Sequence, residues 1–481
     1  MADLSRGPFV SVVIPVYNQS AFLGQAIRSV LSQTHDELEI IVVDDASPDN
    51  PKRVVGQFTD PRVHFTSHAR NRGLPAARNS GISASSGEYI ALLDADDFFH
   101  RDKLREHVRA MVKYPEAGIT YNSRFDLNHS SNTIRQIWRP PENVGLRDFV
   151  LGFPFAPSDM VFRRTCIDLV GMFDEELVNG GEDRDFYCRL ALAGYKFVRV
   201  DRALNYRRYH SNRVIQHLAS RLRDDTESME RTFGDSRCPP EVLKLRNESL
   251  AQWQIVISCL AFMQGEFAFG RSITSEVAGR NQSLVDGRVS QFMHMLVSFS
   301  IMDEGKNHEL LLRRVFEELP NDIVRSETQC KWATSRGYLI RGASNALWGR
   351  SELGLAQLGR ASELSAEIDH GFIGYFAHQL AAYENEFGHQ SAVEALETLS
   401  ECLEVVGGRQ AGRMLRGDYF TNQAFASYRK GDYRAVPRCI ARAVVNEPAH
   451  ASNRGVLAIL ARSLIRRHFS MFAKVDNAIS Q

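Results

Sequence analysis

Three carboxylates that directly follow an apolar run are the strongest chemical feature of the sequence. Residues 89–93 are Tyr-Ile-Ala-Leu-Leu, and Asp94, Asp96 and Asp97 come next. Like charges this close repel one another unless a cation or hydrogen-bond donors lie among them. Carboxylate oxygens suit Mg²⁺ or Mn²⁺, which also bridge to substrate phosphates. The cluster therefore predicts a divalent metal site, with a structural acidic turn as the alternative.

A glycine pair followed by acids forms a second polar cluster. Gly180 and Gly181 precede Glu182 and Asp183, and the residues after them have a helical pattern. Capping of a helix N-terminus explains most acids found in such a first turn. A chemical role becomes the better interpretation here only because other polar clusters precede this one on the same α/β pattern.

Two further apolar runs end in polar residues of the kind that hold a nucleotide. The first leads to Tyr17, whose ring can lie against a base, and the second leads to Asp44 and Asp45. An acid at the carboxyl edge of a sheet can accept hydrogen bonds from a base or a ribose hydroxyl. Taken alone, the first run is better explained by core packing, whereas helix capping accounts equally well for the second.

A turn into a helix lies between these runs and the carboxylate cluster. It spans residues 71–79 and includes Arg72 and Arg78. A helix N-terminus with nearby guanidinium groups can meet a diphosphate. We therefore expect Arg78 to lie close to a bound diphosphate.

The elements that must position these residues follow from hydrophobic periodicity. Short β-branched runs alternate with helical patterns over the first 210 residues or so, which predicts a mostly parallel, Rossmann-like sheet with helices on both faces. The predicted strands are residues 10–16, 39–43, 63–66, 89–93, 118–122 and 197–200. Open sheets of this class bind ligands at the carboxyl ends of their strands, where the polar residues occur.

The second half of the chain has helical periodicity and few glycine or proline breaks, so we expect it to be all α. Residues 431–436, followed by Ala443 and Pro448, resemble part of a tetratricopeptide repeat, and residues 388–393 and 349–354 echo them. A plain helical bundle is the alternative. The predicted domains are residues 1–215, 216–330 and 331–481, the last with the repeat-like pattern.

Composition excludes several classes of function. The 481 residues contain 58 basic and 58 acidic side chains, so no basic excess supports nucleic-acid binding. The seven cysteines include no CxxC pair, which favours buried, reduced thiols. The N-terminus lacks a signal-peptide pattern, and no apolar run reaches the roughly 20 residues of a membrane span. We expect a cytoplasmic protein, with any membrane contact peripheral at the inner face.

Taken in order, the clusters resemble family 2 glycosyltransferases of the GT-A fold, over roughly residues 9 to 213. The resemblance implies an inverting enzyme that uses Mn²⁺ or Mg²⁺ and a nucleotide-sugar donor, with a UDP-sugar as the expected donor. It places the general base on Asp183 and metal ligands on Asp96 and His210, although His210 follows the family's Tyr-Arg-x-His element with one residue out of register. The nucleotide-binding residues that it implies are Pro15, Tyr17, Asp44, Asp45, Arg78 and Asp94.

One departure from the family bears on processivity. Processive members carry a Gln-x-x-Arg-Trp segment and membrane helices after the catalytic acid, and this chain has neither. We therefore expect transfer of one sugar per encounter to a glycan, lipid-linked or protein acceptor, in synthesis of a cell-surface polysaccharide or glycoconjugate. The helical half is expected to bind a protein partner or to support the catalytic domain. The alternative function is an inactive scaffold that binds a partner through that half.

Overall fold

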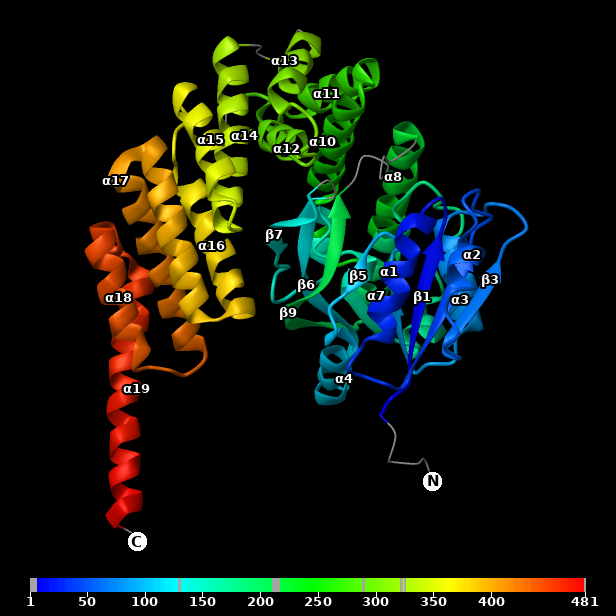
Figure 1. Cartoon of the computed structure of the whole chain (residues 1–481), viewed down its shortest axis with the longest axis horizontal. Coiled ribbons are helices and arrows are strands. Elements are labelled where there is room, and N and C mark those ends of the chain that lie inside the picture. Colours follow the sequence, from blue (N-terminus) through cyan, green and yellow to red (C-terminus); the bar gives the residue numbers. More distant parts are fainter. Residues whose placement is uncertain are drawn as a thin grey trace. The chain divides into compact units, whose positions relative to one another are not determined.

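The computed structural model describes residues 7–128, 131–209, 217–287, 290–320, 323 and 326–479, with side chains described as far as Arg466. His210 therefore lies outside the described residues. The chain divides into two compact units, Met1–Arg325 (unit 1) and Ser326–Gln481 (unit 2). Figure 1 shows the sheet in unit 1 and the helices that make up unit 2.

Unit 1 is built on a nine-stranded mixed sheet in the order β3-β2-β1-β4-β8-β6-β9-β5, with β7 paired to β6. Its first four strands pair in parallel, whereas β5, β7 and β8 are antiparallel to their neighbours. The strands are β1 (Val10–Val16), β2 (Leu38–Asp44), β3 (Val63–Ser67), β4 (Tyr89–Leu92), β5 (Phe98–Phe99), β6 (Ala117–Asn128), β7 (Thr133–Trp138), β8 (Met160–Arg163) and β9 (Lys196–Tyr209).

The predicted α/β class is confirmed, and every predicted strand is present. The three antiparallel strands were not predicted. Residues 98–99 and 160–163 are too short to show a period of two, and β7 is a partly buried strand beside β6. The helices of this part are α1 (Ser20–Leu31), α2 (Pro51–Val55), α3 (Leu74–Ala84), α4 (Lys103–Lys113), α5 (Leu146–Leu151), the 3-10 turn η1 (Pro157–Asp159), α6 (Thr165–Val170) and α7 (Glu182–Leu192).

Helices cover both faces of the sheet, which is why β1 and β4 are apolar at almost every position. Val12 on β1 packs in one core with Leu23 of α1. The next residue, Val13, points to the other face and packs in a second core with Ile82 of α3. The alternation holds α1 and α3 on opposite sides of the strand whose end reaches the candidate site.

The helices after residue 217 begin inside the core of unit 1. Leu218 and Met229 of the first of them, and Trp253 and Ile257 of a later one, are buried together with Phe186 of α7. The predicted boundary near residue 215, as the end of an independently folding domain, stays a prediction. These helices are α8 (Leu218–Gly234), α9 (Pro240–Leu243), α10 (Arg246–Gln264), α11 (Phe267–Arg280), the 3-10 turn η2 (Gln282–Leu284), α12 (Gln291–Ser300) and α13 (His308–Glu318).

Unit 2 is all helical in its described residues, as predicted. Glycines with positive φ stand at its predicted turns: Gly349 (77°), Gly388 (87°) and Gly431 (78°). Such angles favour glycine, because a side chain would crowd the backbone there. The helices are α14 (Glu327–Leu347), α15 (Ser351–Glu363), α16 (His370–Phe387), α17 (His389–Arg429, with a kink at Gly408), α18 (Ala435–Asn446), the 3-10 turn η3 (Pro448–Ser452) and α19 (Arg454–Ile479).

Among the described residues, no helix combines the length and the apolar character needed to cross a membrane.

The close approach of α3 to the sheet gives a test of the fold. A Cβ at Gly81 would lie 2.3 Å from Val13 Cγ1 and 3.1 Å from Val43 Cγ2. Gly81→Ala should therefore lower the free energy of unfolding by about 1–3 kcal/mol despite the better helix propensity of alanine.

The matched control is Gly279→Ala, in helix α11 of the same unit, where a Cβ would meet nothing within 4 Å. That change should leave stability unchanged or raise it by up to about 1 kcal/mol. The free energy of unfolding of both variants is measured by chemical denaturation. Equal stability of the two proteins would contradict the packing of α3 on β1.

Candidate active site

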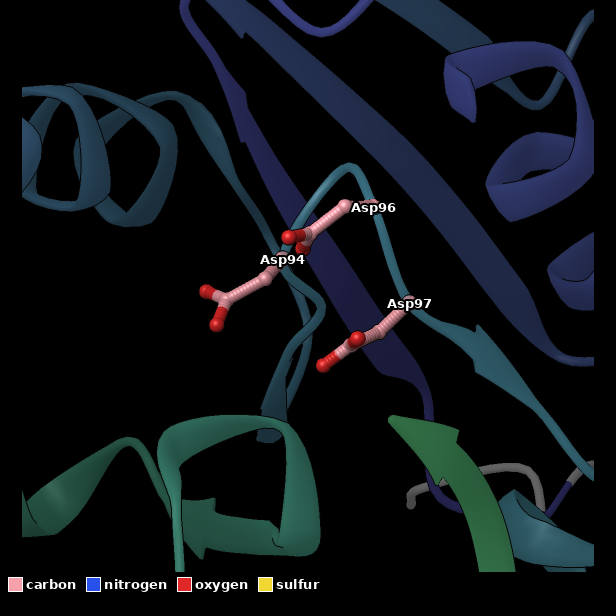
Figure 2. A group of neighbouring side chains, drawn as sticks. All are labelled: Asp94, Asp96 and Asp97. Atoms are coloured by element: carbon pink, nitrogen blue, oxygen red, sulfur yellow. The ribbon is translucent and has the colours of Figure 1, made fainter. Parts of the chain in front are cut away.

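The turn after β4 brings three carboxylates together. Asp94, Asp96 and Asp97 each offer an oxygen within 4.8 Å of the others, and Figure 2 shows them on the loop between β4 and β5. Asp96 and Asp97 are buried, whereas Asp94 is partly exposed. Three oxygen donors at this separation fit Mg²⁺ or Mn²⁺. The residues present are thus chemically suited to the expected metal ion.

Arg208 on β9 donates two hydrogen bonds to this turn. Its Nη1 donates to the backbone oxygen of Asp96 (2.6 Å), and its backbone N–H donates to Asp97 Oδ1 (3.1 Å). Burial lowers the pKa of the Arg208 guanidinium, while Asp97 and Asp96 oppose that shift. The arginine belongs to the element around His210 that the sequence indicated, but its own role was not predicted. It brings positive charge to the turn.

A buried arginine joins the carboxylate turn to the helix that carries Asp183. Arg78 on α3 is 2% exposed, and its Nη1 donates to Glu182 Oε1 (2.7 Å) while its Nη2 donates to Asp94 Oδ1 (3.3 Å). Burial opposes the charge of Arg78, but Glu182, Asp94 and Asp183 outweigh it and raise its pKa. Arg78, which was predicted to lie near a diphosphate, thus forms ion pairs with both Asp94 and Glu182.

Glu182, at the start of α7, belongs to the predicted polar cluster, but the sequence predicted no role for it. Burial and the neighbouring Asp183 raise the pKa of the Glu182 carboxyl to about 7, against the opposing effect of Arg78. Asp183 itself is only partly buried, and its Oδ1 accepts a hydrogen bond from the Arg184 N–H (2.8 Å). Asp183 therefore remains accessible to a ligand at the N-terminus of the helix.

Helix α8 holds the loop before Asp183. Asp224 accepts hydrogen bonds from Asn179 N (3.1 Å) and Nδ2 (2.8 Å). The buried Asp225 lies 3.4 Å from Arg184 Nη1, and its Cα is 3.2 Å from where a Cβ of Gly181 would stand. Gly181 also has a φ of 88°, which favours glycine. Both this backbone angle and the close approach of Asp225 therefore require glycine at this position. No pattern in the sequence pairs α8 with this loop.

A first cleft of about 370 Å³ lies over the carboxyl ends of β1, β2 and β4. Four of the predicted nucleotide-binding residues line it together with Asp96: Pro15, Tyr17, Asp45 and Asp94. The ring of Tyr17 is 50% exposed and so is available to a base. The arrangement places these predicted residues around one concave site.

The two acids after β2 differ in their surroundings. Asp45 is buried and accepts hydrogen bonds from the backbone N–H groups of Arg72 and Gly73, both at 2.8 Å, and its Oδ1 lies 2.7 Å from His68 Nδ1. It therefore anchors the loop that leads into α3. Asp44 accepts from the Ser47 N–H (2.8 Å) and is not among the residues that line the cleft.

A second cleft of about 600 Å³ adjoins the first and shares Leu74, Asp94 and Val178 with it. Asp183, Glu182 and Arg78 line this second cleft. Other parts of its lining come from α10 and from the segment around α12 and α13. The candidate base and the carboxylate turn thus face adjoining clefts.

Residues 11–166 match the sequence model of glycosyl transferase family 2. Chondroitin synthase of Escherichia coli is 29% identical over 195 residues, which are 40% of this chain and 28% of that protein. The putative teichuronic acid biosynthesis glycosyltransferase TuaG of Bacillus subtilis is 36% identical over 108 residues, 22% of this chain and 43% of that protein. The chain thus spans less than half the length of these curated relatives.

Among solved structures, the mannosyltransferase PcManGT from Pyrobaculum calidifontis, in complex with GDP-Man and Mn²⁺, is 18% identical with a TM-score of 0.43. The likeness covers 72% of this chain and 89% of that one. The sequence match contains β1, the acids after β2, Arg78 and the carboxylate turn, and it ends before Asp183. Residues 11–166 of this chain therefore belong to glycosyl transferase family 2.

Proposed function

We propose that the protein transfers a sugar from a nucleotide-diphosphate donor to an acceptor hydroxyl, with inversion at the anomeric carbon. The observation that carries the proposal is the pair of adjoining clefts, one lined by Asp94 and Asp96 and the other by Asp94 and Asp183. A donor with its diphosphate at the carboxylate turn would have its sugar beside the second cleft. The family match supports glycosyl transfer as the reaction.

The nucleoside occupies the first cleft, with its base beside the exposed ring of Tyr17 and the end of β1 at Pro15. Mn²⁺ or Mg²⁺, held by Asp96 together with Asp94, would neutralise the charge that develops on the departing diphosphate. His210, predicted as a further metal ligand, stays a prediction. Arg78 keeps Asp94 in place through its ion pair.

The acceptor enters by the second cleft. Asp183 accepts the proton of the acceptor hydroxyl while that oxygen forms a bond to the anomeric carbon, and the bond from that carbon to the diphosphate breaks. Attack from the side opposite the leaving group inverts the anomeric centre, so that an α-linked donor yields a β-glycoside. Transfer of one sugar per encounter follows from the missing processive elements in the sequence.

The relatives suggest the setting of the reaction. Their names refer to chondroitin and teichuronic acid, and a further relative of 40% identity is the succinoglycan biosynthesis protein ExoO of Rhizobium meliloti. We therefore propose a role in synthesis of a cell-surface polysaccharide or glycoconjugate with a UDP-sugar as donor. The partner expected to bind the helical half of the chain, and attachment to the inner face of the membrane, stay predictions.

Asp96→Asn tests the metal site. The change keeps the size of the side chain but removes a negative oxygen ligand, so divalent-ion-dependent turnover should fall by at least about 100-fold. Turnover is measured with saturating donor over a Mn²⁺ titration. Asp168→Asn, at an exposed acid on α6, is the control and should keep full activity. Turnover by the Asp96 variant equal to that of the control would refute the metal assignment.

Asp183→Asn tests the general base. The amide keeps the shape of the side chain and cannot accept the proton, so the rate of transfer should fall by about 100- to 10,000-fold. Donor affinity should stay within a few-fold, because Asp183 lines only the second cleft. The rate comes from single-turnover kinetics and the affinity from calorimetry. Loss of donor binding would mean that Asp183 is a structural or binding residue, and a normal rate of transfer would mean that Asp183 is not the general base.

A further inference from the structure

Part of the lining of the second cleft, which also contains Asp183, is apolar and only partly buried among the described residues. It consists of partly buried apolar side chains from α10, α12, the segment after it and α13. These side chains are Val256, Leu260, Met263, Phe299, Met302 and Leu311. A concave apolar surface next to a polar centre is typical of a pocket for an apolar group.

Helix α10 explains why this wall is apolar. Most of the circumference of its C-terminal half is buried in the protein core, with Ile257, Cys259 and Phe262 at 0% exposure. Val256, Leu260 and Met263 lie on another face at three- and four-residue spacing. A helix that is apolar all round normally has protein on every side. In unit 1 this second apolar face borders the cleft instead.

Two aromatic rings of the cleft, those of Trp253 and Tyr209, offer little room for stacking against a sugar. Trp253 is 7% exposed, and the guanidinium groups of Arg184 and Arg221 lie 4.6 Å and 5.5 Å from its ring centre. The ring of Tyr209 is likewise covered by Arg135 at 5.0 Å and by Arg207 at 5.3 Å. The apolar side chains from α10, α12 and α13 therefore remain as a surface that an occupant can contact.

We propose that the acceptor is amphipathic: its hydroxyl meets Asp183, and a hydrocarbon chain attached to it lies along Val256, Leu260 and Met263. The inference rests on the proposed function and specifies the acceptor class as lipid-linked. The same cleft contains the base and the apolar wall, so one molecule can contact both. An acceptor made only of sugar would leave the wall exposed to water.

A chain-length series of alkyl glycosides tests this proposal. The full-length protein, with Mn²⁺ and UDP, is titrated by calorimetry with methyl, butyl, hexyl and octyl β-glucosides below their micellar concentrations. Affinity should rise by about fourfold for each methylene that enters the cleft, which corresponds to about 0.8 kcal/mol, until the wall is covered. Affinity independent of chain length would overturn the inference.

Two neighbouring leucines provide matched variants. Leu311 lines the cleft, whereas Leu310, next to it on α13, is 60% exposed and does not line it. Leu311→Ser should weaken octyl glucoside binding about tenfold or more and leave methyl glucoside unaffected, and Leu310→Ser should change neither. Met302→Ser, outside any helix, is a second cleft variant in case Leu311→Ser unfolds. A length dependence that survives in both cleft variants would mean that the chain binds elsewhere and would contradict the proposal.

The same titrations separate this inference from the proposed function. Mn²⁺-dependent binding of UDP or another nucleoside diphosphate is measured on each sample before the glucoside is added. Nucleotide binding combined with length-independent glucoside affinity would contradict the lipid-linked acceptor alone. Absence of any metal-dependent nucleotide binding would contradict the proposed function and, with it, the acceptor role of the cleft.

Discussion

The structure of the candidate site depends on the burial of one positive charge. The Arg78 guanidinium is almost inaccessible to water, and a buried charge without partners is strongly unfavourable. Asp94 and Glu182 supply its partners from two different elements, the turn after β4 and the start of α7. Removal of either carboxylate would leave an uncompensated charge in the interior. The arginine therefore makes the position of the carboxylate turn and that of the Asp183 helix depend on each other.

A second buried ion pair extends this dependence into the helical part of unit 1. Burial lowers the pKa of Arg184 and raises that of Asp225, while the attraction between the two groups opposes both shifts. At both ends of the pair, the loss of hydration thus shifts the pKa more than the attraction between the two charges does. Such an ion pair contributes more to the specificity of packing than to stability. Asp224 completes the attachment through Asn179. The proposed base is therefore supported by α8, outside the segment that matches the family.

The residues that end apolar strands were predictable from the sequence, because a strand of a buried sheet is apolar until it reaches the solvent at its carboxyl end. Pro15, Tyr17, Asp45 and Asp94 line one cleft for this reason. Asp183 could be placed only through its resemblance to a family, since helix capping explains such an acid equally well.

The partners of individual charges could not be predicted from the sequence. Arg78 was expected near a diphosphate, yet its partner Glu182 lies 104 residues further along the chain and no local pattern joins the two. Asp45 was expected at a nucleoside, and the backbone groups of the loop at Arg72 and Gly73 bind its carboxylate. The apolar wall on α10 could not be predicted from the sequence for a related reason. Its periodicity identifies a helix but does not say which face lacks a neighbour.

The central claim is that the carboxylate turn and Asp183 form one metal-dependent glycosyl transfer site. The most direct test is the release of nucleoside diphosphate from a panel of nucleotide sugars, measured by NMR with Mn²⁺ present, after chelation, and after Mn²⁺ is restored. The account predicts that at least one donor releases its diphosphate only when the ion is present, and that transfer to an added acceptor gives the inverted anomer. A folded protein that neither binds nor cleaves any donor in the presence of the ion, or a product that retains the donor configuration, would contradict it.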